Sequence, residues 1–163
     1  MLGGARSGKS AFAERLAQAC GDPVAYVATA RAGDQEMAER IAHHRARRSP
    51  TWRTVEAPSD LAEQLLTEIG LSTVLVEDLT LLLSNHMERD AASAEALTLQ
   101  EVKALLDLEV NVVLVSNEVG MGVVPPYPLG RAFRDALGRV NQAAAASCAE
   151  VYFIVAGLPL RMK

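Results

Sequence analysis

Residues 3–10 read Gly3-Gly4-Ala5-Arg6-Ser7-Gly8-Lys9-Ser10, a complete match to the phosphate-binding pattern G-x-x-x-x-G-K-[ST]. The glycines let the backbone turn tightly and direct successive N–H groups at a phosphate, while Lys9 reaches the β- and γ-phosphate oxygens. The hydroxyl of Ser10 is suited to bind Mg²⁺, and a helix that begins here would add its positive dipole end. The segment predicts a nucleotide-phosphate site; an ordinary glycine-rich turn before a helix is the alternative.

Only Met1 and Leu2 precede this loop. Phosphate loops normally follow a buried strand. We therefore expect a first strand that is very short or that begins upstream of Met1, with the chemistry of the loop unchanged in either case.

Composition indicates one globular domain, residues 1–163, in which half the residues are hydrophobic but only 4% are aromatic, so the core should consist of aliphatic side chains. The formal net charge of −4 argues against a general nucleic-acid binder. Cys20 and Cys148 lack metal-ligand spacing and are expected to be reduced thiols of a cytoplasmic protein. Neither a signal peptide nor an apolar run of about 20 residues that could span a membrane is expected.

Apolar runs of strand length alternate with helical patterns along the chain. Strands are expected at 24–28, 73–76, 110–115 and 151–155, and helices at 35–48, 59–69, 90–108 and 128–147. The strands are nearly continuous in apolar residues, which is typical of a parallel sheet covered on both faces. This order predicts a three-layer α/β fold with a mostly parallel central sheet, in which residues 123–128 form a stiff proline-rich loop.

An acidic pair, Glu77 and Asp78, follows the buried strand at 73–76. A carboxylate at the end of a second strand is typical of the element that organises Mg²⁺ beside a phosphate loop. Glu77 is the favoured candidate because it comes directly off the strand. A solvated strand end is the alternative.

The chain has one dense basic cluster, His43-His44-Arg45-Ala46-Arg47-Arg48. On a helix of about 100° per residue, His44 shares a face with apolar residues, whereas His43 lies among cations on the polar face. A cationic setting attracts polyphosphate and keeps an imidazole neutral, which leaves a ring nitrogen free to attack. The alternative is a solvated basic helix face.

Two further polar segments are candidates for substrate contact. Residues 116–122 follow a strand at the edge where α/β sheets bind ligands, although an ordinary loop between strand and helix would look similar. The polar residues of 133–142 could face substrate, a neighbouring subunit or water.

Together these segments resemble the bifunctional adenosylcobinamide kinase / adenosylcobinamide-phosphate guanylyltransferase family of cobalamin biosynthesis. The resemblance covers essentially the whole chain and is carried by residues 3–10, 26–30, 34–48, 52–58, 77–80 with Asn85, 117–122, 133–135 and 138–142. The histidine segment and Asn117-Glu118-Val119-Gly120-Met121-Gly122 are the most specific of these. Asp78 stands where relatives often have Cys, and Ser49 where a proline is common.

The resemblance implies a RecA-like P-loop fold and two reactions. Adenosylcobinamide is phosphorylated with ATP or GTP, and GMP is then transferred from GTP to the new phosphate through a guanylyl-histidine. By resemblance the catalytic residues are His43, Lys9 and Glu77, with Mg²⁺ bound by Ser10 and Glu77. Besides the whole loop Gly3, Gly4, Ala5, Arg6, Ser7, Gly8, Lys9 and Ser10, the implied nucleotide-binding residues are Ala30, Arg31, Arg47, Arg48, Glu56 and Glu77. The implied partners are the corrinoid, the nucleoside triphosphates and further copies of the chain in a trimer.

Three other functions remain open from the sequence. A monofunctional small-molecule kinase would use the same loop and acid and leave His43 as surface charge. A nucleotide-binding regulator without catalysis could use the polar face of 128–147 for a partner. A nucleic-acid module built on 40–48 is disfavoured by the net charge.

Overall fold

The computed structural model describes residues 1–31, 33 and 35–163, without the side chains of Glu36, Met37, Arg40, His43, His44 and Arg47. The strands are β1 (Leu2–Gly3), β2 (Val24–Ala28), β3 (Arg53–Glu56), β4 (Thr73–Glu77), β5 (Asn111–Leu114), β6 (Ser116–Asn117), β7 (Tyr152–Val155) and β8 (Leu158–Arg161). The helices are α1 (Lys9–Cys20), α2 (Gln35–Arg47), α3 (Leu61–Gln64), α4 (Leu79–Arg89), α5 (Ala94–Leu106) and α6 (Pro128–Ser147).

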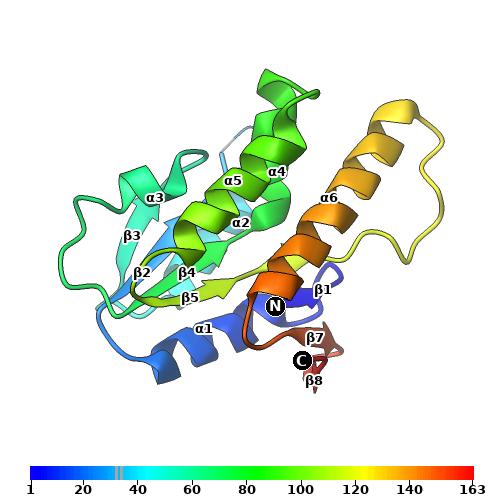
Figure 1. Cartoon of the computed structure of the whole chain (residues 1–163). Coiled ribbons are helices and arrows are strands. Elements are labelled where there is room, and N and C mark those ends of the chain that lie inside the picture. The colour runs from blue at the N-terminus through cyan, green and yellow to red at the C-terminus, as the bar shows by residue number, and fades with distance from the viewer. Residues whose placement is uncertain (32, 34) are drawn as a thin grey trace.

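The strands form two four-stranded groups in the orders β3-β2-β4-β5 and β6-β1-β7-β8. Every pair is parallel except β7 with β8. Val115 alone separates β5 from β6, and its N–H donates to the carbonyl of Val76 at 3.0 Å, so the chain passes directly from one group to the other (Figure 1). The predicted α/β fold with a mostly parallel sheet is confirmed.

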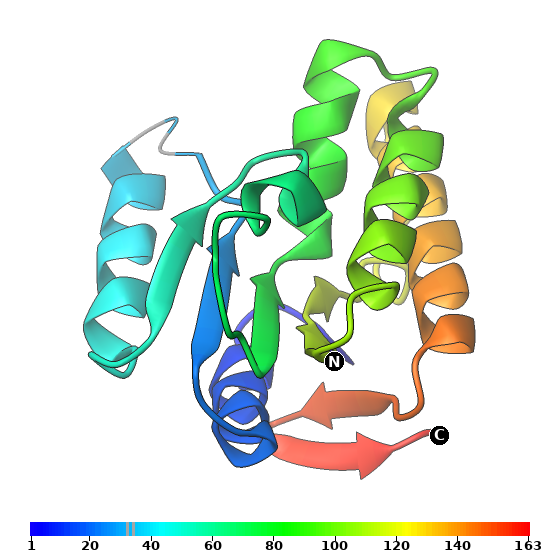
Figure 2. The ribbon, with the colours of Figure 1, turned by 60° about the vertical axis from the view of Figure 1, so that its left-hand side comes forward.

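Helices cover both faces of the strands, as β2 illustrates. Val24, Tyr26 and Ala28 are buried in a cluster with two alanines of α1. The intervening Ala25 and Val27 are buried with side chains of α4, α5 and α6. Because successive strand residues point to opposite faces, this alternation places α1 on one side of the strands and α4, α5 and α6 on the other (Figures 1 and 2).

Two predicted helices differ from the structure in extent. The helix expected at 59–69 is only α3, and its N-cap residue, Asp60, makes no side-chain cap. Leu66 and Ile69 are 77% and 84% exposed. These two side chains have no core to pack on, unlike Leu61 and Leu65 of the same segment, which are buried, and the chain turns instead of continuing the helix. The helix expected at 90–108 is α5, which begins only at Ala94.

Four elements, α4, β3, β6 and β8, were not predicted from the sequence. Strand β3 is short and mostly exposed, so its sequence lacks a buried apolar run. Strand β8 contains Pro159, a residue that argues against a central strand but is tolerated at an exposed edge. Helix α6, in contrast, has the predicted bounds, with Pro128 in its first turn, where a missing N–H costs nothing.

Within the described ranges, no helix combines the length and the apolar character needed to cross a bilayer.

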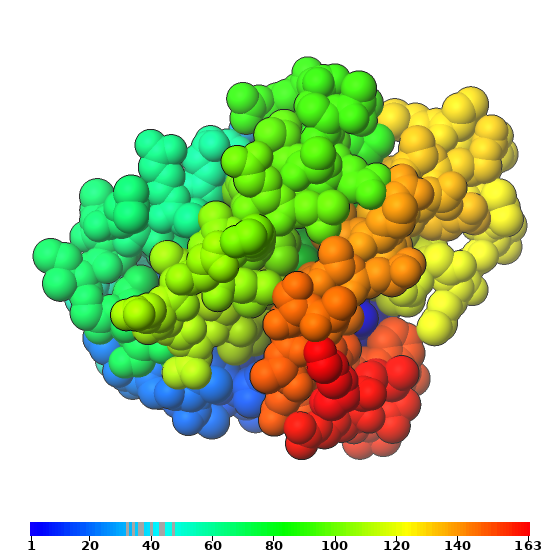
Figure 3. Space-filling model, viewed as in Figure 1, coloured from blue at the N-terminus to red at the C-terminus, as the bar shows by residue number. Residues whose placement is uncertain are grey.

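The surface carries exposed apolar side chains on the loop that leads into α6, where Val123 is 96% exposed. Figure 3 shows this loop projecting at one edge of the molecule beside α6.

Candidate active site

The loop between β1 and α1 includes backbone angles that favour glycine. Gly8 has φ of 93°, in the left-handed region that favours glycine, and a Cβ there would lie 3.1 Å from the Cα of Gly157. The Gly157 N–H donates to the Ser7 carbonyl at 2.8 Å. The turn between β7 and β8 therefore supports the loop from outside. This contact was not predicted from the sequence, although a glycine between two short apolar runs is a typical hairpin signal.

Gly3 is required by a close approach rather than by its backbone angles. A Cβ on this residue would lie 2.6 Å from Ser7 Oγ and 2.7 Å from the carbonyl oxygen of Ile154 in β7. The loop thus folds back over the end of its own strand, with no space for a side chain.

Lys9 is folded into the loop that precedes it. The residue is only 8% exposed, and its Nζ donates to the carbonyl of Gly4 at 3.4 Å. An ammonium group held at the centre of the loop, beside the first turn of α1, is placed to neutralise phosphate oxygens bound there.

Ser10 and Glu77 join the first turn of α1 to the carboxyl end of β4. The Ser10 hydroxyl donates to Glu77 Oε1. Among the described residues, the buried Oε2 has no hydrogen-bond partner. Burial raises the pKa of Glu77 to about 7; the Ser10 hydrogen bond opposes this rise, and the negative charges of Asp78 and Glu14 add to it.

This pair fits a magnesium ion. A buried carboxylate oxygen without a partner and a serine hydroxyl are hard oxygen ligands, and Mg²⁺ usually binds one or two carboxylates together with substrate phosphates and water. In the part of the chain that the structure describes, no cluster of three or more His, Cys, Asp or Glu could bind a metal by itself. A site completed by nucleotide phosphates is consistent with both observations.

Asp78 has a different role from its neighbour. Its Oδ1 accepts from the N–H of Leu81 at 2.9 Å, which caps α4, and its Oδ2 accepts from Asn117 Nδ2 at 3.1 Å. Burial raises its pKa as well. Because both carboxylate oxygens are engaged within the fold, Glu77 is the acid of the pair that is available to a ligand.

Asn117 connects the loop to two helices. Its Nδ2 also donates to Thr80 Oγ1 at 2.9 Å, and its carbonyl accepts from Asn141 Nδ2 of α6 at 3.1 Å. In the sheet it pairs with Gly3. The residue that the sequence placed at a ligand-binding edge thus joins the phosphate loop, α4 and α6.

Arg48 lies against the face of β2. Its Cζ is 3.4 Å from the centroid of the Tyr26 ring, a cation–π contact, and its Nη1 donates to Thr54 Oγ1 at 3.3 Å. Beside it lies a hollow of about 420 Å³, lined by Ala11, Glu14, Arg15, Gln18, Arg48, Ser49 and Trp52. The α1 residues of this hollow run from Ala11, next to Ser10, to Gln18, and Arg48 forms part of its wall.

The remaining predicted nucleotide-binding residues are less enclosed. Ala30 and Arg31 follow the end of β2, where Arg31 is exposed. Glu56 forms an exposed ion pair with Arg45 at 2.5 Å. Helix α2 includes positions 43, 44 and 47, but the side chains of His43, His44 and Arg47 lie outside what the structure describes.

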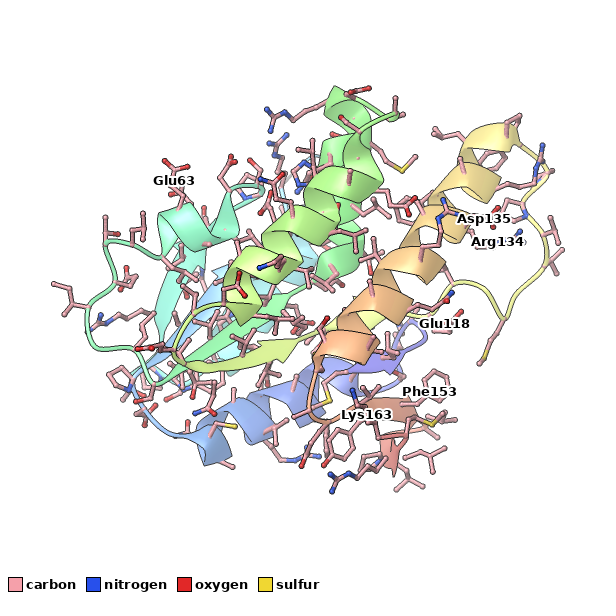
Figure 4. The ribbon with its side chains drawn as sticks, viewed as in Figure 1. Glu63, Glu118, Arg134, Asp135, Phe153 and Lys163 are labelled. Carbon is pink, nitrogen blue, oxygen red and sulfur yellow. The ribbon has the colours of Figure 1, made fainter. Side chains whose placement is uncertain are left out.

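The polar residues of α6 turn out to have several partners. Arg139 forms an ion pair with Glu95 of α5 at 2.7 Å, and Asn141 is buried. Arg134 pairs with the adjacent Asp135 at 3.1 Å; Figure 4 shows both on α6, and Glu118 where the chain leaves β6. Much of the polar face of this helix is therefore engaged by the protein itself.

Comparison with known proteins agrees with this geometry. Residues 1–162 match the family described as cobinamide kinase / cobinamide phosphate guanyltransferase. The bifunctional adenosylcobalamin biosynthesis protein CobP of Pseudomonas aeruginosa is 48% identical, with 100% of this chain and 95% of the relative covered. The CobU proteins of Escherichia coli and Salmonella typhimurium are 42% and 39% identical, each with 100% of this chain and 98% of the relative covered.

We predict opposite effects of Glu77→Gln on stability and on magnesium use. Between about pH 4.5 and 7 the folded chain holds the Glu77 proton and the unfolded chain does not, so stability falls as the pH rises through this window. Glu77→Gln removes that loss and should raise the melting temperature near pH 8, with a smaller gain near pH 5. It should also raise the Mg²⁺ needed for half-maximal turnover by about tenfold or more. Thermal unfolding without metal and a magnesium titration measure the two effects.

Asp78→Asn is the matched control, because asparagine can still cap α4. We expect it to change the magnesium requirement much less than Glu77→Gln does. The reverse ranking in the titration would assign the metal to Asp78.

Proposed function

The chain belongs to the cobinamide kinase / cobinamide phosphate guanyltransferase family, and from this premise we propose how its residues carry out the two reactions. The enzyme is a transferase of cobalamin biosynthesis that phosphorylates adenosylcobinamide and then transfers GMP from GTP to the new phosphate. The observation that most strongly supports a nucleotide and metal site is the contact of Ser10 with the buried Glu77 beside Lys9.

One phosphate site serves both reactions in this proposal. In the kinase reaction, the corrinoid hydroxyl attacks the γ-phosphorus of ATP or GTP, and the bond to the β-phosphate oxygen breaks. In the second reaction, attack occurs at the α-phosphorus of GTP, and pyrophosphate leaves. The β- and γ-phosphates occupy residues 3–10 in both cases, so Lys9 and the loop N–H groups stabilise either leaving group.

The proposed metal is Mg²⁺, bound by the Ser10 hydroxyl and the free oxygen of Glu77. When bound, it would neutralise charge on the β- and γ-phosphates. Glu77 must be ionised to bind it, and Lys9 favours that form because its positive charge lowers the pKa of Glu77.

His43 of α2 is the proposed nucleophile for GMP transfer. A neutral ring nitrogen attacks the α-phosphorus, a P–N bond forms as pyrophosphate leaves, and the acceptor phosphate then displaces the histidine. That acceptor is a phosphate monoester with two negative charges. Arg48, held over Tyr26 next to the hollow along α1, is placed to reduce the repulsion as it approaches.

We further propose that the enzyme works as a homo-oligomer, a trimer by resemblance, in the cytoplasm, where nucleoside triphosphates are made. Exposed apolar side chains on the loop before α6, in the first turn of α6 and on β8 support association; they include Met121, Val123, Val124, Leu129, Leu158 and Leu160. Sedimentation equilibrium measures the subunit number directly. A monomer at micromolar concentration would contradict this part of the proposal.

His43→Ala should abolish GMP transfer and leave the phosphorylation of adenosylcobinamide largely intact, because only the transfer needs a nitrogen nucleophile. The measurements are the amounts of the two corrinoid products and the mass of the intact protein after incubation with GTP and Mg²⁺. Wild-type protein should gain one GMP, in an acid-labile and base-stable linkage.

The neighbouring histidine provides the control. His44→Ala should retain the GMP adduct, although it can cost stability through lost packing. An adduct that persists in His43→Ala and disappears in His44→Ala would refute the assignment. A wild-type protein that phosphorylates the corrinoid and never gains GMP would identify a monofunctional kinase.

Lys9→Ala should reduce both reactions by on the order of 10²-fold or more, because one ammonium stabilises both leaving groups. Lys103→Ala is the control, since Lys103 is an exposed lysine that pairs with Asp107 within α5 and its C-cap. Kinase turnover near the wild-type rate in Lys9→Ala would disprove the shared site.

A further inference from the structure

Asn85 of α4 joins the ends of two strands through one side-chain amide. The residue is 6% exposed, and its Nδ2 donates to the carbonyl of Thr29 at 2.9 Å and to the carbonyl of Pro58 at 2.9 Å. Thr29 directly follows β2, and Pro58 lies two residues beyond β3. An amide nitrogen carries two N–H groups, so both of its donors are used.

The residues of these two carbonyls lie before and after the part of the chain that contains α2 and β3. The chain leaves the sheet after Thr29, forms α2, and returns through β3, which ends at Glu56. Ala30, Arg31 and Glu56, three of the proposed nucleotide-binding residues, lie just inside the two points that Asn85 holds. Beside the backbone pairing of β2 with β3, two side-chain hydrogen bonds of this one residue therefore hold both ends of the segment against α4.

Neighbouring hydrogen bonds also hold Thr29 and the chain just after Pro58 in place. Thr29 Oγ1 donates to the carbonyl of Asp78 at 2.9 Å and accepts from the Asp78 N–H at 2.7 Å. On the other side, His86 Nε2 lies 2.8 Å from Glu101 Oε1, and Glu101 Oε2 accepts from the N–H of Leu61 at 2.9 Å. Helix α4 thus fixes the chain after β3 directly at Pro58 and, through α5, again at Leu61.

The phosphate loop is supported by other contacts. Its hydrogen bonds run to the β7–β8 turn through Gly157, to Glu77 through Ser10, and to Glu118, whose N–H donates to the Gly3 carbonyl at 3.0 Å. Loss of the Asn85 amide would therefore disturb the α2 segment and leave the loop in place.

We propose that Asn85 is a positioning residue for GMP transfer, because it fixes the carboxyl ends of β2 and β3 and so places the α2 segment relative to the phosphate loop. The inference rests on the proposed function, in which His43 of α2 carries the GMP. A small misplacement of a nucleophile costs a large factor in rate, whereas the chemical step of the kinase reaction uses the loop, Lys9 and Glu77 and takes no nucleophile from α2.

Two variants separate positioning from packing. Asn85→Asp keeps the shape of the side chain but places a carboxylate against two carbonyl oxygens, whereas Asn85→Ala removes the group. We expect the rate of GMP-adduct formation, followed by intact-protein mass, to fall about 10²-fold in Asn85→Asp and about tenfold in Asn85→Ala. The kinase kcat at saturating nucleotide should stay within about threefold of wild type in both variants, because that chemical step takes no group from the displaced segment.

Asn111, the exposed first residue of β5, provides a control at the amino ends of the strands. Asn111 Nδ2 also donates to two carbonyls, those of Ser72 at 3.2 Å and Cys20 at 3.4 Å, far from the strand ends that carry the site. Asn111→Ala should lower the melting temperature without changing the ratio of the two activities.

Three results would overturn the inference about Asn85: unchanged adduct formation, an equal loss of both activities, or a smaller loss in Asn85→Asp than in Asn85→Ala, which would indicate packing alone. Failure of the proposed function would look different, because wild-type protein would then carry no GMP on His43. The wild-type adduct is therefore mapped before the variants are compared.

Discussion

The hydrogen bond between Ser10 and Glu77 is the interaction on which the site depends. It joins the first turn of α1, on one side of the strands, to the end of β4 within the sheet, and it holds a carboxylate in a buried position where its pKa is raised to about 7. A buried acid with an unpartnered oxygen costs stability in the ligand-free protein. A metal ion bound with the nucleotide phosphates would give that oxygen a partner and so remove the cost. The destabilising group therefore lies at the place where the ligand binds.

The other polar residues at this edge of the sheet give the arrangement its rigidity. Asp78 caps α4 and accepts from Asn117, which is itself paired with Gly3 of the loop. Asn85 connects the ends of β2 and β3. Side chains of α4 thus take part in two networks, one behind the phosphate loop and one beside the segment that carries α2. The two reactions of the family can therefore depend on different supports within one fold.

The sequence predicted the parts of the fold that have strong local signals. The phosphate loop, the strand at 24–28 and helix α6 follow from a motif, from a continuous apolar run and from a proline at the helix start, respectively. It failed where tertiary contacts decide: α3 ends early because Leu66 and Ile69 find no core, and β8 is a strand in spite of Pro159. The preference for Glu77 over Asp78 was made from position alone, and the contacts of Asp78 now support it. Neither Asn85 nor Gly157 could be given a role from sequence, because their partners are distant along the chain. The preference for His43 over His44 rests on helix periodicity and on the family resemblance.

The central claim is that one phosphate site serves both reactions, and competition between two nucleotides tests it most directly. Wild-type protein would be saturated with a non-hydrolysable ATP analogue and Mg²⁺ and then titrated with a non-hydrolysable GTP analogue in a calorimeter. The shared site at residues 3–10 predicts one nucleotide bound per chain in total, with the apparent affinity for the second nucleotide reduced in proportion to the concentration of the first. Two nucleotides bound per chain at once, with neither weakening the other, would contradict the account.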